Sequence, residues 1–316
     1  MKQTNLQTSA KRLNGKKISD MIWYRTFQII TFLCASVIIV IIAFILIKGL
    51  SPFFKTYTID GNEYRVNLGE FLIGTTWFRH PNHYGIGYII VNTIYCVLLC
   101  LVLAVPMAIF SALFITRIAP KPISKVLQLI IELLSSIPSI IFGLVGMGYI
   151  TQGVKYVASW FGVQTAGGLS TLSVVLVLAF MIYPTITMLS ITAINAVGKD
   201  IINGSLALGA SKTQTNFKVV LGAAKNGIFA GIILGVGRAL GEATAISLVS
   251  GNRGSGPTFS LFDTTNTLTT TILKGFQDTT GLDYDIRFSV GVVLIVLIVA
   301  INIILNAVKR RVGAKV

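Results

Sequence analysis

Charged residues and histidine are scarce in this 316-residue chain, which contains 12% Asp, Glu, Lys and Arg and only two histidines. Soluble domains carry about 25% charged residues, and a soluble chain of this length could not bury the 53% of hydrophobic residues found here. The mean hydropathy of +0.79 and several uncharged stretches of about 20 residues exclude a disordered chain and an ordinary soluble enzyme. The composition therefore predicts an integral membrane protein.

Cysteine is also rare. Cys34, Cys96 and Cys100 lie in apolar stretches, with no CxxC pair and no histidine nearby. His80 and His83 are too few to hold zinc by themselves. We therefore exclude a disulfide-stabilised scaffold, and we expect reduced cysteines that act as small hydrophobic residues and no metal site.

Six apolar stretches are long enough to cross a bilayer as helices, which takes about 20 residues at 1.5 Å per residue. We predict spans at 27–47, 86–116, 124–150, 171–193, 217–250 and 288–308. The predicted fold is all-α and integral to the membrane, with an N-terminal arm at 1–26, a transmembrane domain at 27–308 and a tail at 309–316. The polar part of the arm, up to Asp20, is expected to be mobile.

The distribution of charge predicts the orientation of these spans, because cytoplasmic loops are enriched in Lys and Arg. If both termini are cytoplasmic, 17 of the 26 basic residues lie inside and eight outside, whereas seven of the 11 acidic residues lie outside. We therefore predict cytoplasmic termini. The net charge of +15 is then explained by topology and does not indicate a nucleic-acid partner.

Two charged residues lie within the fifth predicted span, in the run from Gly237 to Glu242. A charge near the bilayer centre costs about 2.5 to 3.5 kcal/mol on insertion scales, so each charge needs a partner or a water-filled path. Arg238 and Glu242 are four residues apart on one helix face, so they could neutralise each other. Alternatively, Arg238 could face an anion in a translocation path, because a planar guanidinium can hold an oxyanion through two hydrogen bonds.

A third charge, Glu132, lies in the third predicted span and precedes Pro138. Proline removes a backbone donor, so the helix should bend or break there, and nearby serines can hydrogen-bond the freed carbonyl groups. Broken helices at membrane depth often line substrate paths, but a purely structural kink explains the same pattern. The candidate substrate-path residues are Arg238, Glu242, Glu132, Ser135, Ser136 and Ser139.

A predicted cytoplasmic coupling loop at 199–216 carries a second pattern. It resembles the loop of ABC importer permeases, in which Glu-Ala-Ala is followed by three residues, Gly, nine residues and Ile-x-Leu-Pro. The spacing is kept here, but Asn203 replaces the acidic residue and Gly222 replaces the proline. A short helix that ends at Gly209 would give another protein a rigid contact surface. The candidate ATPase-coupling residues are Asn203, Gly204, Ser205, Leu206, Ala207, Leu208 and Gly209.

Together the two patterns resemble the membrane subunits of the bacterial phosphate-specific (Pst) importer. The similarity covers roughly residues 20–310, and its most specific parts are Arg-Ala-Leu-Gly-Glu at 238–242 and Ile-Pro-Ser-Ile at 137–140. Gly251-Asn252 and the lead-in at 132–134 are more similar to the C-type permease than to its A-type partner.

This resemblance implies a type I ABC importer permease with a MetI-like fold in the bacterial inner membrane. The implied partners are a second permease subunit, two copies of an ATPase, an extracellular phosphate-binding protein, phosphate and membrane lipid. The chain contains no Gly-x-x-x-x-Gly-Lys-Ser/Thr loop, so we expect neither enzymatic activity nor a cofactor here, with ATP and Mg on the ATPase. In the family, the Arg and Glu of the fifth-helix motif are tied to phosphate passage and correspond to Arg238 and Glu242.

Two other functions fit parts of the same sequence. A permease for another oxyanion, such as molybdate or sulfate, would share the coupling loop, although the relatives with those substrates lack the Arg-Ala-Leu-Gly-Glu run. A secondary transporter or channel without an ATPase would suit six spans and an intramembrane Arg and Glu. It would leave the spacing of the coupling loop unexplained.

Overall fold

The computed structural model describes residues 2–59, 61–78 and 83–313 and, within them, the side chains of residues 20–58, 61, 63–78 and 83–311. His80 lies outside the described residues, as do Met1 of the predicted arm and residues 314–316 of the predicted tail. Within the described part, six helical stretches are long and apolar enough to cross a membrane. They are Asp20–Phe54, Gly87–Ile118, Ser139–Trp160, Thr171–Asn195, Lys212–Gly241 and Gly281–Arg311. The predicted all-α membrane fold is confirmed.

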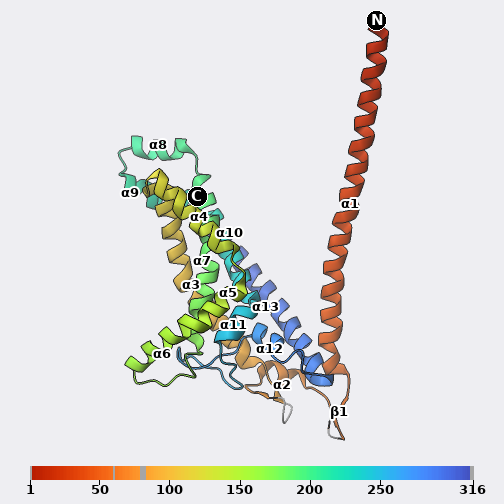
Figure 1. Cartoon of the computed structure of the whole chain (residues 1–316), viewed down its shortest axis with the longest axis vertical. Coiled ribbons are helices and arrows are strands. Elements are labelled where there is room, and N and C mark those ends of the chain that lie inside the picture. The colour runs from red at the N-terminus through yellow and green to blue at the C-terminus, as the bar shows by residue number, and fades with distance from the viewer. Residues whose placement is uncertain (1, 60, 79–82, 314–316) are drawn as a thin grey trace.

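The helices form an elongated bundle with two distinct ends (Figure 1). The long helices are α1 (Lys2–Phe54), α3 (Gly87–Leu113), α4 (Lys121–Ser136), α7 (Thr171–Asn195), α10 (Leu221–Gly241) and α13 (Gly281–Gly313). The shorter ones are α2 (Leu68–Ile73), α5 (Ser139–Val145), α6 (Thr151–Trp160), α8 (Lys199–Ala207), α9 (Lys212–Gln214), α11 (Thr244–Val249) and α12 (Leu268–Leu273). Three π-helical segments join consecutive helices: η1 (Phe114–Ile118), η2 (Gly146–Ile150) and η3 (Thr215–Val220).

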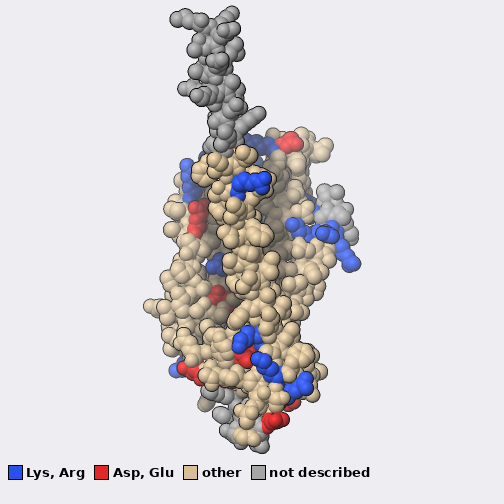
Figure 2. Space-filling view, turned by 90° about the vertical axis from the view of Figure 1, so that its right-hand side faces the viewer, with Lys and Arg blue, Asp and Glu red and all other residues tan. Residues whose placement is uncertain are grey.

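The start of α1, the end of α13 and the short helix α8 all lie at one end of the bundle, which we call the coupling end (Figure 1). Helices α2 and α6 lie at the opposite end, which we call the cap end. On the face shown in Figure 2, most Lys, Arg, Asp and Glu side chains lie toward these two ends, and few charged atoms are visible in the band between them. The arrangement agrees with the prediction that both termini and the coupling loop share one side of the membrane.

The N-terminal arm and the first span form one helix, so no break in secondary structure marks the predicted boundary between residues 26 and 27, and the mobility of the arm stays a prediction. Helix α1 runs without a break from Lys2 to Phe54, because extending a helix that already exists avoids the cost of a new nucleus. Its upper half stands apart from the bundle (Figure 1). Its cap-end part packs on α13, where a Cβ at Gly49 would come within 2.6 Å of the Phe288 carbonyl oxygen.

The third predicted span, 124–150, is wrong in its bounds. The chain forms α4, turns at Ile137 and Pro138, and continues as α5, η2 and α6, so the apolar span is Ser139–Trp160. Polar residues recur every three or four positions in α4, at Lys121, Lys125, Gln128 and Glu132. This spacing is typical of an amphipathic helix rather than of a span.

Helix α7 is the centre of the bundle, with 61% of its most apolar window buried. It packs against α3, α4 and α10. The approach of α10 is close because glycines on α10 face α7, and a Cβ at Gly235 would lie 2.8 Å from the Ile186 side chain. This close packing fixes the position of the charged run that follows Gly235.

A small cap covers the cap end. Two antiparallel hairpins, β1 (Tyr57–Ile59) with β2 (Asn62–Tyr64) and β3 (Trp77–Phe78) with β4 (His83–Tyr84), surround α2. Phe71 of α2 and Tyr84 pack with Ile86 and with Ile286 of α13 in one buried cluster. The sequence of this segment predicts no regular structure, because strands of two or three residues are too short to show a periodic pattern.

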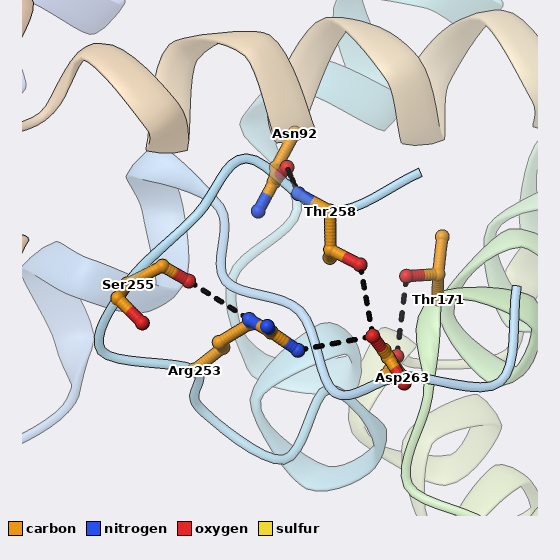
Figure 3. Close-up of polar contacts among 6 residues, drawn as sticks. All are labelled: Asn92, Thr171, Arg253, Ser255, Thr258 and Asp263. Carbon is orange, nitrogen blue, oxygen red and sulfur yellow. Dashed lines mark hydrogen bonds and ion pairs between the residues drawn. The ribbon is translucent and has the colours of Figure 1, made fainter. Parts of the chain in front are cut away.

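The loop after α11 is tied to two spans by polar contacts (Figure 3). Arg253 Nη1 lies 3.1 Å from Asp263 Oδ2, and the Thr258 hydroxyl donates to the same carboxylate. The Thr258 N–H donates to the Asn92 side-chain oxygen on α3, and the Thr171 N–H at the start of α7 donates to the Asp263 carbonyl oxygen. Arg253 and Asp263 therefore hold a loop in place at the cap end.

Candidate functional site

Arg238 lies one turn before the end of α10, and its side chain is half-buried against α7. Its Nη1 donates a hydrogen bond of 2.8 Å to the hydroxyl oxygen of Thr185. Thr185 is neutral, so it orients the guanidinium without cancelling its charge. The other guanidinium N–H groups have no hydrogen-bond acceptor among the described residues, which leaves them available to water or an anion.

A groove of about 640 Å³ opens beside this arginine between α7, α10 and α13. The residues that line it are Thr185, Ala230, Ile233, Leu234, Gly237, Arg238, Asn302, Asn306 and Lys309. Gly237 leaves room at the groove wall, since a Cβ there would meet no atom within 4 Å. Arg238 and Lys309 are the charged residues of the lining, so the groove carries positive charge without an acidic residue beside it.

Glu242 lies just beyond α10, where the chain leaves the helix with an extended backbone. The side chain is buried, and its Oε1 accepts the backbone N–H of Ala245 at 2.9 Å. The Glu242 carbonyl oxygen accepts the Thr269 hydroxyl at 2.6 Å. The carboxylate therefore caps the first turn of α11, as carboxylates do at helix starts.

The predicted fifth span, 217–250, is therefore interrupted, and α10 and α11 are separate helices on either side of Glu242 and Ala243. The interruption removes the helical geometry that would place Glu242 one turn from Arg238. No ion pair joins the two within the part of the chain that the structure describes, so the mutual neutralisation considered from the sequence is absent. The signal for the break was Gly241 followed by an acidic residue, which is typical of a helix end and a new cap.

Glu132 lies elsewhere, exposed on α4 and outside the span Ser139–Trp160. The break at Pro138 follows the prediction, and the Ser136 hydroxyl donates to the Leu133 carbonyl oxygen at 2.7 Å. Ser135 and Ser139 flank the break. None of these four residues lines the groove beside Arg238, so the six predicted substrate-path residues do not form one cluster.

The predicted coupling loop forms a compact unit at the coupling end. Helix α8 ends at Ala207, and Gly209 adopts φ +84°, a left-handed conformation that favours glycine. The predicted end at Gly209 is thus confirmed. Ser205 and Thr215 share a hydrogen bond of 3.0 Å, and Ser211 and Gln214 form a capping box at the start of α9.

The most prominent feature of this unit is Leu208, which is 91% exposed. The other predicted coupling residues, Asn203, Gly204, Ser205, Leu206, Ala207 and Gly209, lie beside it on α8 or directly after that helix. Ile202, in contrast, is buried with Val220 of η3. The unit therefore presents an apolar tip on a base that is anchored to the bundle.

Thr185, Asn302, Asn306 and Lys309 were not predicted as site residues. Thr185 and α13 meet Arg238 only through tertiary packing, so no short-range motif joins them. The spacing of the α13 residues, four and then three, was a signal available in the sequence. Within the described residues no group of three or more His, Cys, Asp or Glu side chains could hold a metal ion.

The capping role of Glu242 predicts how substitutions there affect stability. Glu242→Gln keeps a side-chain oxygen that can accept the Ala245 N–H, whereas Glu242→Leu leaves this donor without its acceptor. We expect Glu242→Leu to lower the free energy of unfolding by about 1 kcal/mol and Glu242→Gln to cost less than half of that. Thermal unfolding of the purified protein in detergent measures both, and equal stability of Glu242→Leu and the wild type would contradict the cap.

Comparison with known proteins identifies the family. The family described as "Binding-protein-dependent transport system inner membrane component" matches residues 104–316, which is more than half of the chain. The probable ABC transporter permease protein YqgH of Bacillus subtilis (strain 168) is 39% identical over 52% of this chain and 52% of its own length. The phosphate transport system permease protein PstC of Pasteurella multocida is 28% identical over 58% of this chain and 63% of its own length. The PstC protein of Xylella fastidiosa (strain 9a5c) is 28% identical over 78% of this chain and 80% of its own length. The matched region thus spans about half of the Bacillus relative, less than two thirds of the Pasteurella relative and 80% of the Xylella relative.

Solved structures share the architecture. A chain of a bacterial ABC transporter involved in the import of the acidic polysaccharide alginate has a TM-score of 0.60 at 19% identity, covering 89% of this chain and 95% of its own. A chain of the MetNI methionine ABC transporter has a TM-score of 0.53 at 19% identity, and the match covers 72% of this chain and 94% of that one. These likenesses confirm the MetI-like permease fold. With its six candidate spans, the chain belongs to the family of binding-protein-dependent transport system inner membrane components.

Proposed function

We propose that this chain is one permease subunit of an ATP-driven importer of inorganic phosphate and forms half of its translocation path. The observation that carries the proposal is the groove beside Arg238. An arginine inside a span is hydrogen-bonded to a neutral threonine, and a second basic residue lines the same groove without any acidic one. A charge is tolerated at this depth where a polar path or a counter-ion offsets its desolvation, and an anion is the counter-ion that suits this lining.

The relatives' names favour phosphate among the oxyanions. The proteins from Pasteurella and Xylella are both phosphate transport permeases of the C type. The chemistry of the groove alone suits any small oxyanion, because guanidinium and ammonium groups bind sulfate or molybdate through the same donors. The C type of these relatives agrees with the resemblance at residues 132–134 and 251–252, and we propose that this chain is of the same type.

Four further components complete the proposed importer. A second permease subunit would close the open side of the groove, and an extracellular phosphate-binding protein would deliver phosphate at the cap end. Two copies of an ATPase would bind at the coupling end and hold ATP and Mg. The chain itself would have no catalytic activity and no cofactor, and membrane lipid would surround its apolar faces.

Helix α8 is the proposed contact with the ATPase. A leucine that is 91% exposed at the tip of a rigid turn is expected to bury its side chain against a partner, because such burial gains about 1.5 to 3 kcal/mol. The hydrogen-bonded base that connects α8 to η3 and α10 would pass a movement of the ATPase to the span that carries Arg238.

Transport by the reconstituted complex tests the proposal directly. We expect uptake of radiolabelled phosphate into proteoliposomes to require internal ATP and external binding protein, and to resist competition by sulfate and molybdate. Stronger uptake of sulfate or molybdate would identify another oxyanion as the substrate. Uptake without ATP or an ATPase would contradict the importer and favour a secondary transporter.

A conservative substitution of Arg238 separates anion contact from a structural charge. In Arg238→Lys the charge remains but the planar pair of donors is lost, so we expect phosphate uptake to fall by at least about tenfold, the value of one hydrogen bond to a charged group. The double variant Arg238→Leu/Glu242→Leu should not regain phosphate uptake, since the two side chains form no ion pair. Near-normal uptake by either variant would contradict the proposed contact.

Substitution of Leu208 tests the coupling contact. Leu208→Glu would place a charge in an apolar ATPase pocket, so we expect ATPase stimulation by the loaded binding protein to fall at least about tenfold. Leu208→Met keeps an apolar side chain and should retain stimulation. Leu208 is a cleaner probe than Gly209, where any side chain would strain the left-handed backbone. Full stimulation of the assembled Leu208→Glu complex would rule out this contact.

A further inference from the structure

Three polar residues form a stripe along the C-terminal part of α13, whose span is mainly apolar. Asn302, Asn306 and Lys309 are spaced four and three residues apart, which places them on one face. We call them the α13 stripe. The neighbours Ile303 and Ile304 are exposed hydrophobic residues outside the groove, so the polar residues occupy one narrow face of the helix.

The α13 stripe lines the same groove as Arg238 and Thr185. It contributes the amide N–H₂ groups of two asparagines and one ammonium, and asparagine and lysine are both hydrogen-bond donors. Glu242, the acidic residue nearest to Arg238 along the chain, is outside the lining and caps α11. The groove therefore combines two positive charges with several donors, a combination that suits an anion with more than one oxygen.

The polar groups of the stripe are not satisfied by the rest of the described chain. Among the described residues, no hydrogen bond or ion pair involves the side chain of Asn302, Asn306 or Lys309. Amide groups in a membrane span are costly without partners, so such residues usually face water or a ligand. Packing of α13 on its neighbours does not explain the stripe.

The direction of the stripe is informative. Lys309 is seven residues beyond Asn302, a distance of about 10 Å along a helix, and α13 ends at the coupling end (Figure 1). Arg238 lies one turn before the end of α10, which begins near the coupling end. The groove therefore leads from Arg238, inside the bundle, toward the coupling end.

We propose that the α13 stripe forms the exit half of the anion path, through which phosphate released by Arg238 passes to the coupling end. Lys309 attracts the departing anion, and the two asparagine amides replace water around its oxygens along the way. This assignment rests on the proposed function, because it takes phosphate as the transported anion. It adds Asn302, Asn306 and Lys309 as substrate-contacting residues.

Charge reversal at the exit tests this assignment with a matched control. Lys309→Glu would repel an anion leaving the groove, and we expect phosphate uptake by the assembled complex to fall at least about tenfold. Arg310→Glu makes the same change in charge at an adjacent, exposed position that does not line the groove. It should keep uptake within about twofold of the wild type. Equal uptake by the two variants would overturn the assignment.

Apolar substitution of the asparagines separates transport from folding. Asn302→Leu and Asn306→Leu make α13 more apolar, so membrane insertion should be preserved or improved. We expect both variants to assemble normally and to retain ATPase stimulation, but to transport less phosphate per ATP hydrolysed. Wild-type transport per ATP in both variants would contradict a path along α13.

Labelling provides a measurement that a purely structural role would not change. With the exposed Cys34 changed to alanine, Asn306→Cys should react with an anionic methanethiosulfonate reagent, and phosphate with ATP should slow the reaction. Ile303→Cys, outside the groove, should not be protected. Equal phosphate effects at the two positions would overturn the assignment.

The outcomes also separate this inference from the proposed function. Suppose that the wild type takes up phosphate and that Arg238→Lys does not. Normal phosphate uptake by the three stripe variants, Lys309→Glu, Asn302→Leu and Asn306→Leu, would then show that only the exit path is wrong. If the wild-type complex transports no phosphate, the proposed function and the exit path both fall.

Discussion

Arg238 places a permanent positive charge inside a membrane span, and the surrounding structure keeps that charge accessible. Glycines on α10 bring this helix close to α7, where Thr185 holds one guanidinium nitrogen without neutralising it. The next acidic residue, Glu242, is turned away because α10 ends before it. A carboxylate one helical turn away would have satisfied the arginine internally and weakened its attraction for an anion. The end of α10 thus separates two charges that the sequence places together.

The groove is linked to the two ends of the bundle by different structures, which lie on either side of the helix break. On the cap side, Glu242 caps α11 and accepts the Thr269 hydroxyl, and the loop after α11 is fastened to α3 and α7 through Asp263, Thr258 and Asn92. On the other side, α10 continues through η3 to the unit around α8. The helix is continuous only from Lys212 to Gly241, and α8 contacts η3 within that stretch, whereas the break after α10 separates the groove from the loop on the cap side.

The predictions that succeeded depend on local chemistry. Runs of apolar residues fixed the number of spans, Pro138 marked a helix break, and Gly209 marked the end of α8. The failures involve competition between elements. Helix α1 extends through the polar arm because elongation follows easily from an existing span, and α4 is a separate amphipathic helix although its hydrophobic residues continue the third apolar stretch. The groove itself was only partly predictable, because Arg238 is recognisable as an unusual charge while Thr185 and the α13 stripe reach it through packing of distant segments.

A density map of the assembled complex with bound phosphate tests the central claim most directly. Single-particle imaging of the complex, trapped with phosphate and a non-hydrolysable ATP analogue, would locate the anion. We expect phosphate density beside Arg238, with oxygen atoms about 2.7 to 2.9 Å from the guanidinium nitrogens and room for the anion in the groove between α7, α10 and α13. Phosphate density in another part of the membrane region, with Arg238 bound only to protein groups, would contradict the claim that this groove is the anion path.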